Sequence, residues 1–190
     1  MRALNEFKQQ NGLFPQKIIV YRDGVSDGQK RVVLNQELCQ IKSAIEKLDL
    51  SDTKIMLILV NKRINTRLFS MESGDRLTNP LPGTVIDYGI VRRDGYDFYL
   101  VSQRTRQGVA TPTHYTVVYD DVGAPAEQII SLTYKLCYTY YNVAGSIRVP
   151  APIQYAHRLA NLIGDRAVKV KTDPFTPNKH LEGKHSLFYI

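Results

Sequence analysis

The sequence predicts an α/β fold in which helices flank a mixed sheet. Three observations carry this prediction. A strand–helix–strand pattern spans residues 17–60, a group of antiparallel strands follows within residues 84–119, and helical patterns occupy much of the remainder. The chain begins inside an alternating helix–strand pattern, with no strand before its first helix. We therefore expect residues 1–190 to form one domain whose N-terminal strands are missing.

The first parallel unit follows from apolar periodicity. Residues 1–10 are interpreted as the last part of a helix, with Gly12 just beyond its end, and an apolar strand follows over 17–21. Apolar residues then recur at steps of four and three over 34–48, which predicts an amphipathic helix. Residues 54–60 are almost continuously apolar, as expected of a parallel strand covered on both faces. The two strands and the helix between them predict a right-handed crossover.

The antiparallel group is marked by a turn signal. Apolar segments at 84–91 and 96–102 flank the sequence RRDG at 92–95, which predicts a hairpin. A further strand is expected over 114–119.

Two prolines indicate where the later helices start. Pro125 lies near the start of a helix expected to reach about Tyr141, and Pro152 opens another that is expected to run to Gly164. Tyrosines at helical spacing (134, 138 and 141) are interpreted as packing residues. The tail after Gly164 is irregular but ends in the apolar residues 187–190.

The net charge and composition predict what kind of molecule this chain binds. A net charge of +7, from 25 Lys and Arg against 18 Asp and Glu, favours polyanions, with nucleic acid ahead of a membrane surface. No apolar run approaches the ~20 residues of a membrane helix, and the N-terminus lacks the features of a signal peptide. These features predict a cytoplasmic or nuclear protein.

Cys39 and Cys137 occupy apolar helical positions, so we expect both to be buried and neither to bind metal.

Asp23 is the first candidate site residue. It ends an apolar strand and is followed by a glycine-punctuated loop, the place where open α/β sheets collect ligands and metals. The alternative is an ordinary Asp-Gly turn. His157, considered by residue type alone, is more typical of a structural histidine. Lys62, Arg63 and Arg67 follow the second parallel strand, where they form either a solvated basic loop or a set of phosphate contacts.

An ordered series of motifs resembles one family. The motifs are YRDGVSDGQ (21–29), NTRLF (65–69), PGTV (82–85), DFYL (97–100), PTHY (112–115), LTYKLC (132–137), VPAP (149–152) and YAH (155–157). Together they resemble the C-terminal portion of the PIWI domain of Argonaute proteins, over essentially the whole chain. RVPAP at 148–152 points to the Piwi branch, and so does Leu162, where the Argonaute branch tends to carry arginine.

This resemblance implies an RNase H-like fold and RNA-guided cleavage of RNA in small-RNA silencing. The family's active site holds two Mg²⁺ ions with three carboxylates and a closing histidine or carboxylate. Asp23 matches the last carboxylate and His157 the closing residue. The other two ligands belong to an upstream part of the same protein that this chain lacks. One carboxylate and one imidazole cannot hold two ions about 4 Å apart, so the isolated chain is expected to be inactive.

The resemblance also implies RNA contacts. Lys62 and Arg67 match positions that contact guide phosphates, and Gln103, Arg148 and Gln154 match further positions of the guide channel. The terminal carboxylate of Ile190 is a candidate metal ligand near the 5′ phosphate of the guide. The implied partners are a guide small RNA, a target RNA and the missing N-terminal part of the protein, with no membrane.

Three alternatives remain at this stage. A family member that does not slice would silence by recruiting other proteins. A plain basic nucleic-acid-binding module predicts that Asp23 and His157 lie far apart, whereas the slicer interpretation brings them to one metal site. A small-molecule enzyme is disfavoured, because the chain has no glycine motif that cradles phosphate and no nucleophile arrangement.

Overall fold

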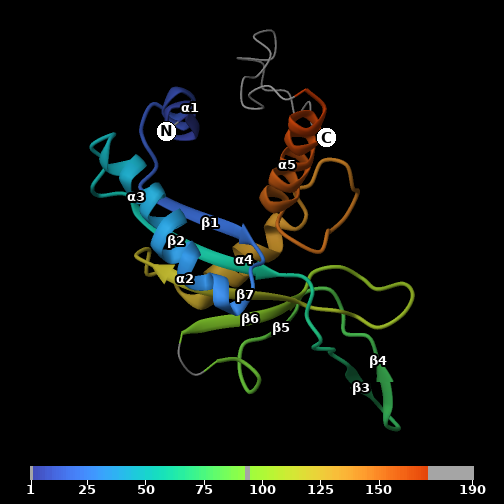
Figure 1. The fold of residues 1–190 in the computed structure, drawn as a ribbon. Helices are drawn as coiled ribbons and strands as arrows, with labels where there is room; N and C mark the ends of the chain where they lie inside the picture. The colour runs from blue at the N-terminus through green and yellow to red at the C-terminus, as the bar shows by residue number, and fades with distance from the viewer. Residues whose placement is uncertain (1, 93–94, 171–190) are drawn as a thin grey trace.

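The computed structural model describes residues 2–92 and 95–170, which form a mixed five-stranded sheet with helices on both faces (Figure 1). The strand order is β1-β2-β7-β6-β5, and a separate two-stranded sheet pairs β3 with β4. The strands are β1 (Lys17–Asp23), β2 (Lys54–Asn61), β3 (Ser70–Glu72), β4 (Arg76–Thr78), β5 (Thr84–Ile86), β6 (Tyr96–Val101) and β7 (Thr113–Asp120). The helices are α1 (Arg2–Asn11), α2 (Lys30–Val32), α3 (Cys39–Glu46), α4 (Ala126–Leu136) and α5 (Ala151–Val170).

Parallel and antiparallel pairing meet at β2. Strand β1 runs parallel to β2, with Lys17 opposite Lys54 and Asp23 opposite Val60. On its other side β2 pairs antiparallel with β7, with an irregularity between Leu57 and Ile58. The predicted crossover unit and the predicted antiparallel group are therefore joined through β2.

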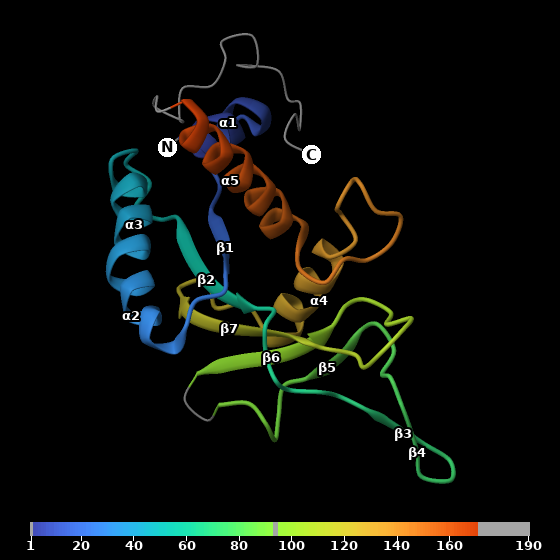
Figure 2. The same ribbon diagram turned by 45° about the vertical axis from the view of Figure 1, so that its right-hand side comes forward.

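Residues 55–60 of strand β2 are all apolar because helices cover both faces of the strand (Figure 2). Its even-numbered residues from Met56 to Val60 pack in one cluster with Ile129 of α4 and Ile153 of α5. Its odd-numbered residues pack in a second cluster, with side chains of the helix that follows β1: Val33, Leu38 and Ile45. Alternate residues of a strand point to opposite faces, so this double coverage explains the apolar run.

The predicted helix between the two parallel strands is present but is not uniformly α-helical. A short 3₁₀ turn (Asp27–Gln29) leads into α2, a π-helical segment η2 (Val33–Leu38) follows, and α3 completes the helix. Leu38 and Ile45 are buried as the periodicity predicts, but Cys39 is exposed, so the prediction of a buried Cys39 is wrong. The residue after Leu38 lies about 100° further round the helix, which turns it away from the sheet.

Three element boundaries differ most from those predicted. Strand β5 ends at Ile86 rather than at residue 91, because the chain turns at Gly89, which has a φ of 76°. Helix α4 ends at Leu136, since the carbonyl of Cys137 accepts a hydrogen bond from the N–H of Ile147 (2.8 Å) instead of from a following helical turn. Helix α5 continues through Gly164 to Val170.

Two further differences concern side chains and a missed hairpin. Tyr141 lies beyond α4 and is 84% exposed, so it is not the packing residue that its spacing predicted. Tyr134 and Tyr138 do contact each other edge-on, with ring centroids 5.2 Å apart. The β3–β4 hairpin was not predicted from the sequence. Within the described residues, no helix is both long enough and apolar enough to cross a membrane.

Candidate functional site

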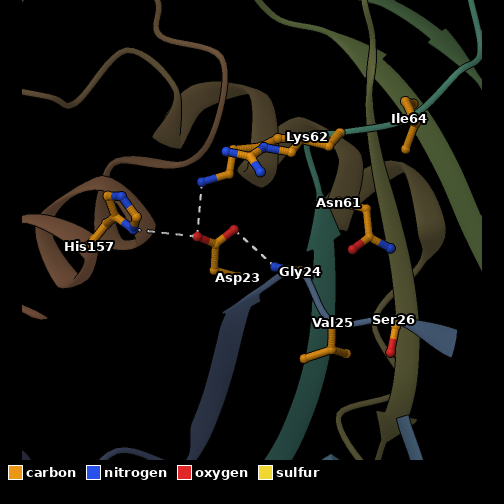
Figure 3. A pocket seen from close by; sticks show the side chains of 9 residues that line it. Asp23, Gly24, Val25, Ser26, Asn61, Lys62, Ile64 and His157 are labelled. Atoms are coloured by element: carbon orange, nitrogen blue, oxygen red, sulfur yellow. Dashed lines mark hydrogen bonds and ion pairs between the residues drawn. The ribbon is translucent and has the colours of Figure 1, made fainter. Parts of the chain in front are cut away.

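The carboxyl ends of the parallel strands β1 and β2 meet at one edge of the sheet and carry the candidate site. Asp23 is the last residue of β1, and it pairs in register with Val60, next to the end of β2. The chain leaves the strand through Gly24, whose N–H donates to Oδ1 of Asp23 (2.9 Å). The other carboxylate oxygen, Oδ2, faces away from this turn toward residues of other elements (Figure 3).

Helix α5 brings His157 to that second oxygen. The segment before the helix is tied to the sheet by Thr113, whose hydroxyl donates to the carbonyl of Arg148 (3.0 Å). Ile153 is buried against the β1 side of the core, and His157 lies four residues later on the same helical face. His157 Nδ1 lies 3.7 Å from Asp23 Oδ2 (Figure 3). Two residues 134 positions apart in the chain therefore share one site.

Lys62 contacts the same oxygen. Its Nζ donates to Asp23 Oδ2 at 2.9 Å, from the loop that follows β2. Partial burial raises the pKa of the Asp23 carboxyl, but the hydrogen bonds from Lys62 and Gly24 and the charges of Lys62 and His157 outweigh this effect. The pKa of Asp23 consequently lies below its ordinary value, and the carboxylate is ionised at neutral pH.

A cavity of about 550 Å³ opens beside these three side chains. Its lining comes from the two strand ends and from α5, and consists of residues 23–26 and 61–64 together with His157. Both Asp23 and His157 reach solvent, with side chains 33% and 51% exposed. An external ligand can therefore reach Asp23 Oδ2 and His157 Nδ1 together.

Asp23 and His157 provide part of a ligand set for a hard divalent cation. A carboxylate oxygen is a ligand that Mg²⁺ prefers, and a neutral imidazole nitrogen can complete such a set. Among residues 2–92 and 95–170, however, no group of three or more His, Cys, Asp or Glu side chains is placed to hold a metal. Asp23 and His157 fit a metal site that needs further ligands.

The other predicted RNA contacts are spread around the site. Arg148 donates from Nη2 to the carbonyl of Lys62, while its Nε is buried without a hydrogen-bond partner. Burial and the nearby charge of Arg67 lower the pKa of Arg148. Gln103 and Arg148 line a second, smaller cavity of about 160 Å³. Gln154 is half-buried one turn before His157 and lines neither cavity.

Ile190 lies outside the described residues. His114 is buried, with Nε2 2.6 Å from Asp97 Oδ2, consistent with a structural role. Sequence reasoning did not single out Asn61 or Gly24, although both are next to residues that it named at the strand ends.

The fold is that of Argonaute proteins, and comparisons with known proteins identify the family. The Piwi domain family matches residues 1–168, so the chain belongs to the Piwi domain family. It is 50% identical to the Piwi-like protein Ago3 of Bombyx mori over 163 residues, which are 85% of this chain and 18% of that protein. The chain thus spans about a fifth of the length of such relatives.

Solved structures agree with this assignment. The crystal structure of Drosophila Piwi matches with a TM-score of 0.74 and 40% identity, over 86% of this chain and 22% of that one. The crystal structure of Kluyveromyces polysporus Argonaute with a guide RNA matches with a TM-score of 0.74 and 27% identity, over 85% of this chain and 21% of that one. The mixed sheet flanked by helices is therefore the arrangement found in Argonaute proteins.

Proposed function

We propose that this chain is part of a small-RNA-guided RNA endonuclease and supplies two of its metal-binding catalytic residues, Asp23 and His157. The observation that carries the proposal is the convergence of their side chains, 3.7 Å apart, at the carboxyl end of two parallel strands. Membership of the Piwi domain family supports a guide nucleic acid as the ligand, since a structural relative is bound to a guide RNA.

In this proposal Asp23 and His157 hold Mg²⁺ together with ligands from the rest of the protein. Mg²⁺ supplies the activation of water and the stabilisation of the leaving oxygen. The chain's own contribution is to fix the two ligands. The Gly24 N–H holds one oxygen of Asp23 and leaves the other facing the cavity, while α5 presents the imidazole from the opposite side.

Guide binding is assigned to the basic residues around this edge. Lys62, Arg67 and Arg148 lie in or beside the loop after β2, and Gln103 shares a cavity with Arg148. Cationic side chains bind phosphate oxygens through charge-assisted hydrogen bonds, and such contacts position RNA without reading its sequence. Gln154 is proposed as a further contact, on the face of α5 near His157. The terminal carboxylate of Ile190 is proposed as a metal ligand near the 5′ phosphate of the guide.

The test is guide-directed cleavage of a matched target RNA by the intact protein that carries this chain. Asp23→Asn and His157→Ala are each expected to lower the rate by about a hundredfold or more, because metal stabilisation of the transition state is worth several kcal/mol. Asp52→Asn removes an exposed carboxylate at the other end of the sheet and is expected to leave the rate unchanged. Wild-type rates in the Asp23 and His157 variants would refute the proposal. Guide binding without any cleavage would indicate the non-slicing alternative.

The 190-residue chain alone is expected to be inactive as a nuclease. Its described part contains only two candidate ligands at this site, too few for a pair of Mg²⁺ ions. Incubating the purified chain with guide and target RNA in Mg²⁺ checks this prediction. Cleavage that disappears on chelation and in Asp23→Asn would contradict it.

A further inference from the structure

Lys62 occupies the side of Asp23 from which a metal would bind. Its Nζ lies 2.9 Å from Oδ2, the same oxygen that His157 Nδ1 approaches to 3.7 Å. The other oxygen is already committed to the Gly24 N–H. The carboxylate therefore has one oxygen directed at the cavity, and the ammonium group neutralises it (Figure 3).

An ammonium group and a divalent cation compete for that oxygen. Mg²⁺ binds oxygen at about 2.1 Å, and at that position it would repel a positive nitrogen bonded to the same atom. Charge repulsion therefore favours withdrawal of the Lys62 ammonium group when a metal binds Asp23 Oδ2. The Asp23–Lys62 pair is partly exposed, at 33% and 29%, so breaking this ion pair costs little free energy.

The main chain and side chain of Lys62 are held by different partners. Its carbonyl accepts a hydrogen bond from Arg148, which fixes the backbone of the loop after β2. Its side chain lines the 550 Å³ cavity, where a flexible four-carbon stem has room to change rotamer. The backbone of Lys62 thus lies beside Arg148, which is close enough to Arg67 for their charges to interact, and such neighbouring cations favour an incoming phosphate.

We propose that Lys62 is an exchangeable counter-cation that couples metal binding to RNA binding. Without RNA it pairs with Asp23 and weakens metal binding. When an RNA phosphate takes up the ammonium group, Asp23 Oδ2 becomes available. By thermodynamic linkage, RNA then tightens metal binding and metal tightens RNA binding by the same factor. This inference rests on the proposed function, and it adds that Lys62 regulates the same site.

The experiment is a Mn²⁺ titration of the intact protein, followed by electron paramagnetic resonance, with and without saturating single-stranded RNA of guide length. Mn²⁺ serves as a probe because it shares the preference of Mg²⁺ for oxygen ligands. Without RNA, Lys62→Met is expected to bind Mn²⁺ about two- to fivefold more tightly than the wild type, the range for a partly exposed ion pair. RNA is expected to tighten Mn²⁺ binding in the wild type and to do so less in Lys62→Met.

Two variants separate this effect from general electrostatics. Lys54→Met removes the same charge at the amino-terminal end of β2, outside this cavity, and is expected to leave the ratio of affinities with and without RNA as in the wild type. Lys62→Arg keeps the charge and is expected to retain the coupling. Equal behaviour of Lys62→Met and Lys54→Met would overturn the inference, and so would wild-type Mn²⁺ affinity in Lys62→Met.

Asp23→Asn distinguishes failure of this inference from failure of the proposed function. If Asp23→Asn leaves Mn²⁺ binding unchanged, the proposed metal site itself is wrong. If Asp23→Asn abolishes binding while Lys62→Met matches the wild type with and without RNA, the site stands and the role of Lys62 is wrong.

Discussion

Asp23 owes its electrostatic state to neighbours from three parts of the chain. Gly24 belongs to its own turn, Lys62 to the loop after β2, and His157 to α5. The position of Asp23 at a strand end could be predicted from the sequence. Its nearness to His157 followed only from the family resemblance, because the packing of α5 on the sheet is a tertiary property. The Lys62 contact depends on a single rotamer and could not be predicted.

At the scale of single residues, the pKa of Asp23 gives a first test. The folded-state pKa lies below the ordinary value of 3.8, so the ionised carboxylate stabilises the fold above about pH 4, and this stabilisation is lost as the pH falls through the folded-state pKa. Lys62→Met is expected to raise the pKa of Asp23, because the hydrogen bond and charge that lower it are removed. Carboxyl ¹³C NMR measures the change. An unaltered pKa in the variant would contradict the Lys62 contact.

Gly24 gives a second test, because its backbone passes close to the end of β2. A Cβ at this position would overlap Oδ1 of Asn61 and lie 3.0 Å from the carbonyl oxygen of Val60. Gly24→Ala is therefore expected to destabilise the fold by about 1–3 kcal/mol, the range for overpacking. Gly28→Ala is a matched control, since no atom lies within 4 Å of its added Cβ. Chemical denaturation measures the free energy of unfolding of both variants. Equal values would show that the loop at Gly24 is not constrained.

At the scale of elements, a paired arginine and glutamate join β1 to the π-helical segment after it. Arg22 contacts both carboxylate oxygens of Glu37, through Nε at 2.9 Å and Nη2 at 3.1 Å. Its Nη1 donates to the carbonyl of Asp23 at 2.7 Å. π-helical turns often occur near functional sites, and here one carries the carboxylate that orients Arg22. The pair thus supports the backbone of the candidate site.

Glu37→Gln is expected to cost only about 0.5–1 kcal/mol in stability, because the side chains of Arg22 and Glu37 are 37% and 41% exposed and solvent screens their charges. The larger effect is expected locally, as faster amide hydrogen exchange in residues 23–26. Glu46→Gln, on the exposed end of α3, is the control. Unchanged exchange at these amides would mean that the pair does not support the site.

Element types were more predictable than element ends. The apolar run of β2 and the periodic helix after β1 are consequences of burial, which the residue pattern records directly. The end of α4 depends on a hydrogen bond between Cys137 and Ile147, across ten residues of irregular chain. The exposure of Cys39 depends on which face of a helix meets the sheet. Such tertiary contacts cannot be predicted from the pattern of neighbouring residues in the sequence.

At the scale of the whole molecule, the net charge of +7 predicts salt-sensitive RNA binding. In a plot of log affinity against log salt concentration, Arg67→Met is expected to reduce the slope by about 0.7, the value for one phosphate contact on single-stranded RNA. Lys54→Met, at the amino-terminal end of β2, is the control and is expected to keep the wild-type slope. Fluorescence anisotropy with a short RNA measures the slope for both variants. Equal slopes would mean that Arg67 does not contact RNA.

The central claim is that Asp23 and His157 bind one metal, and pulsed electron paramagnetic resonance of Mn²⁺ in the intact protein tests it most directly. A nitrogen coupling from a directly bound imidazole is expected in the wild type. It should disappear in His157→Ala, and Asp23→Asn should lose the bound Mn²⁺ altogether. Wild-type nitrogen coupling in His157→Ala, together with unchanged Mn²⁺ affinity in Asp23→Asn, would contradict the account.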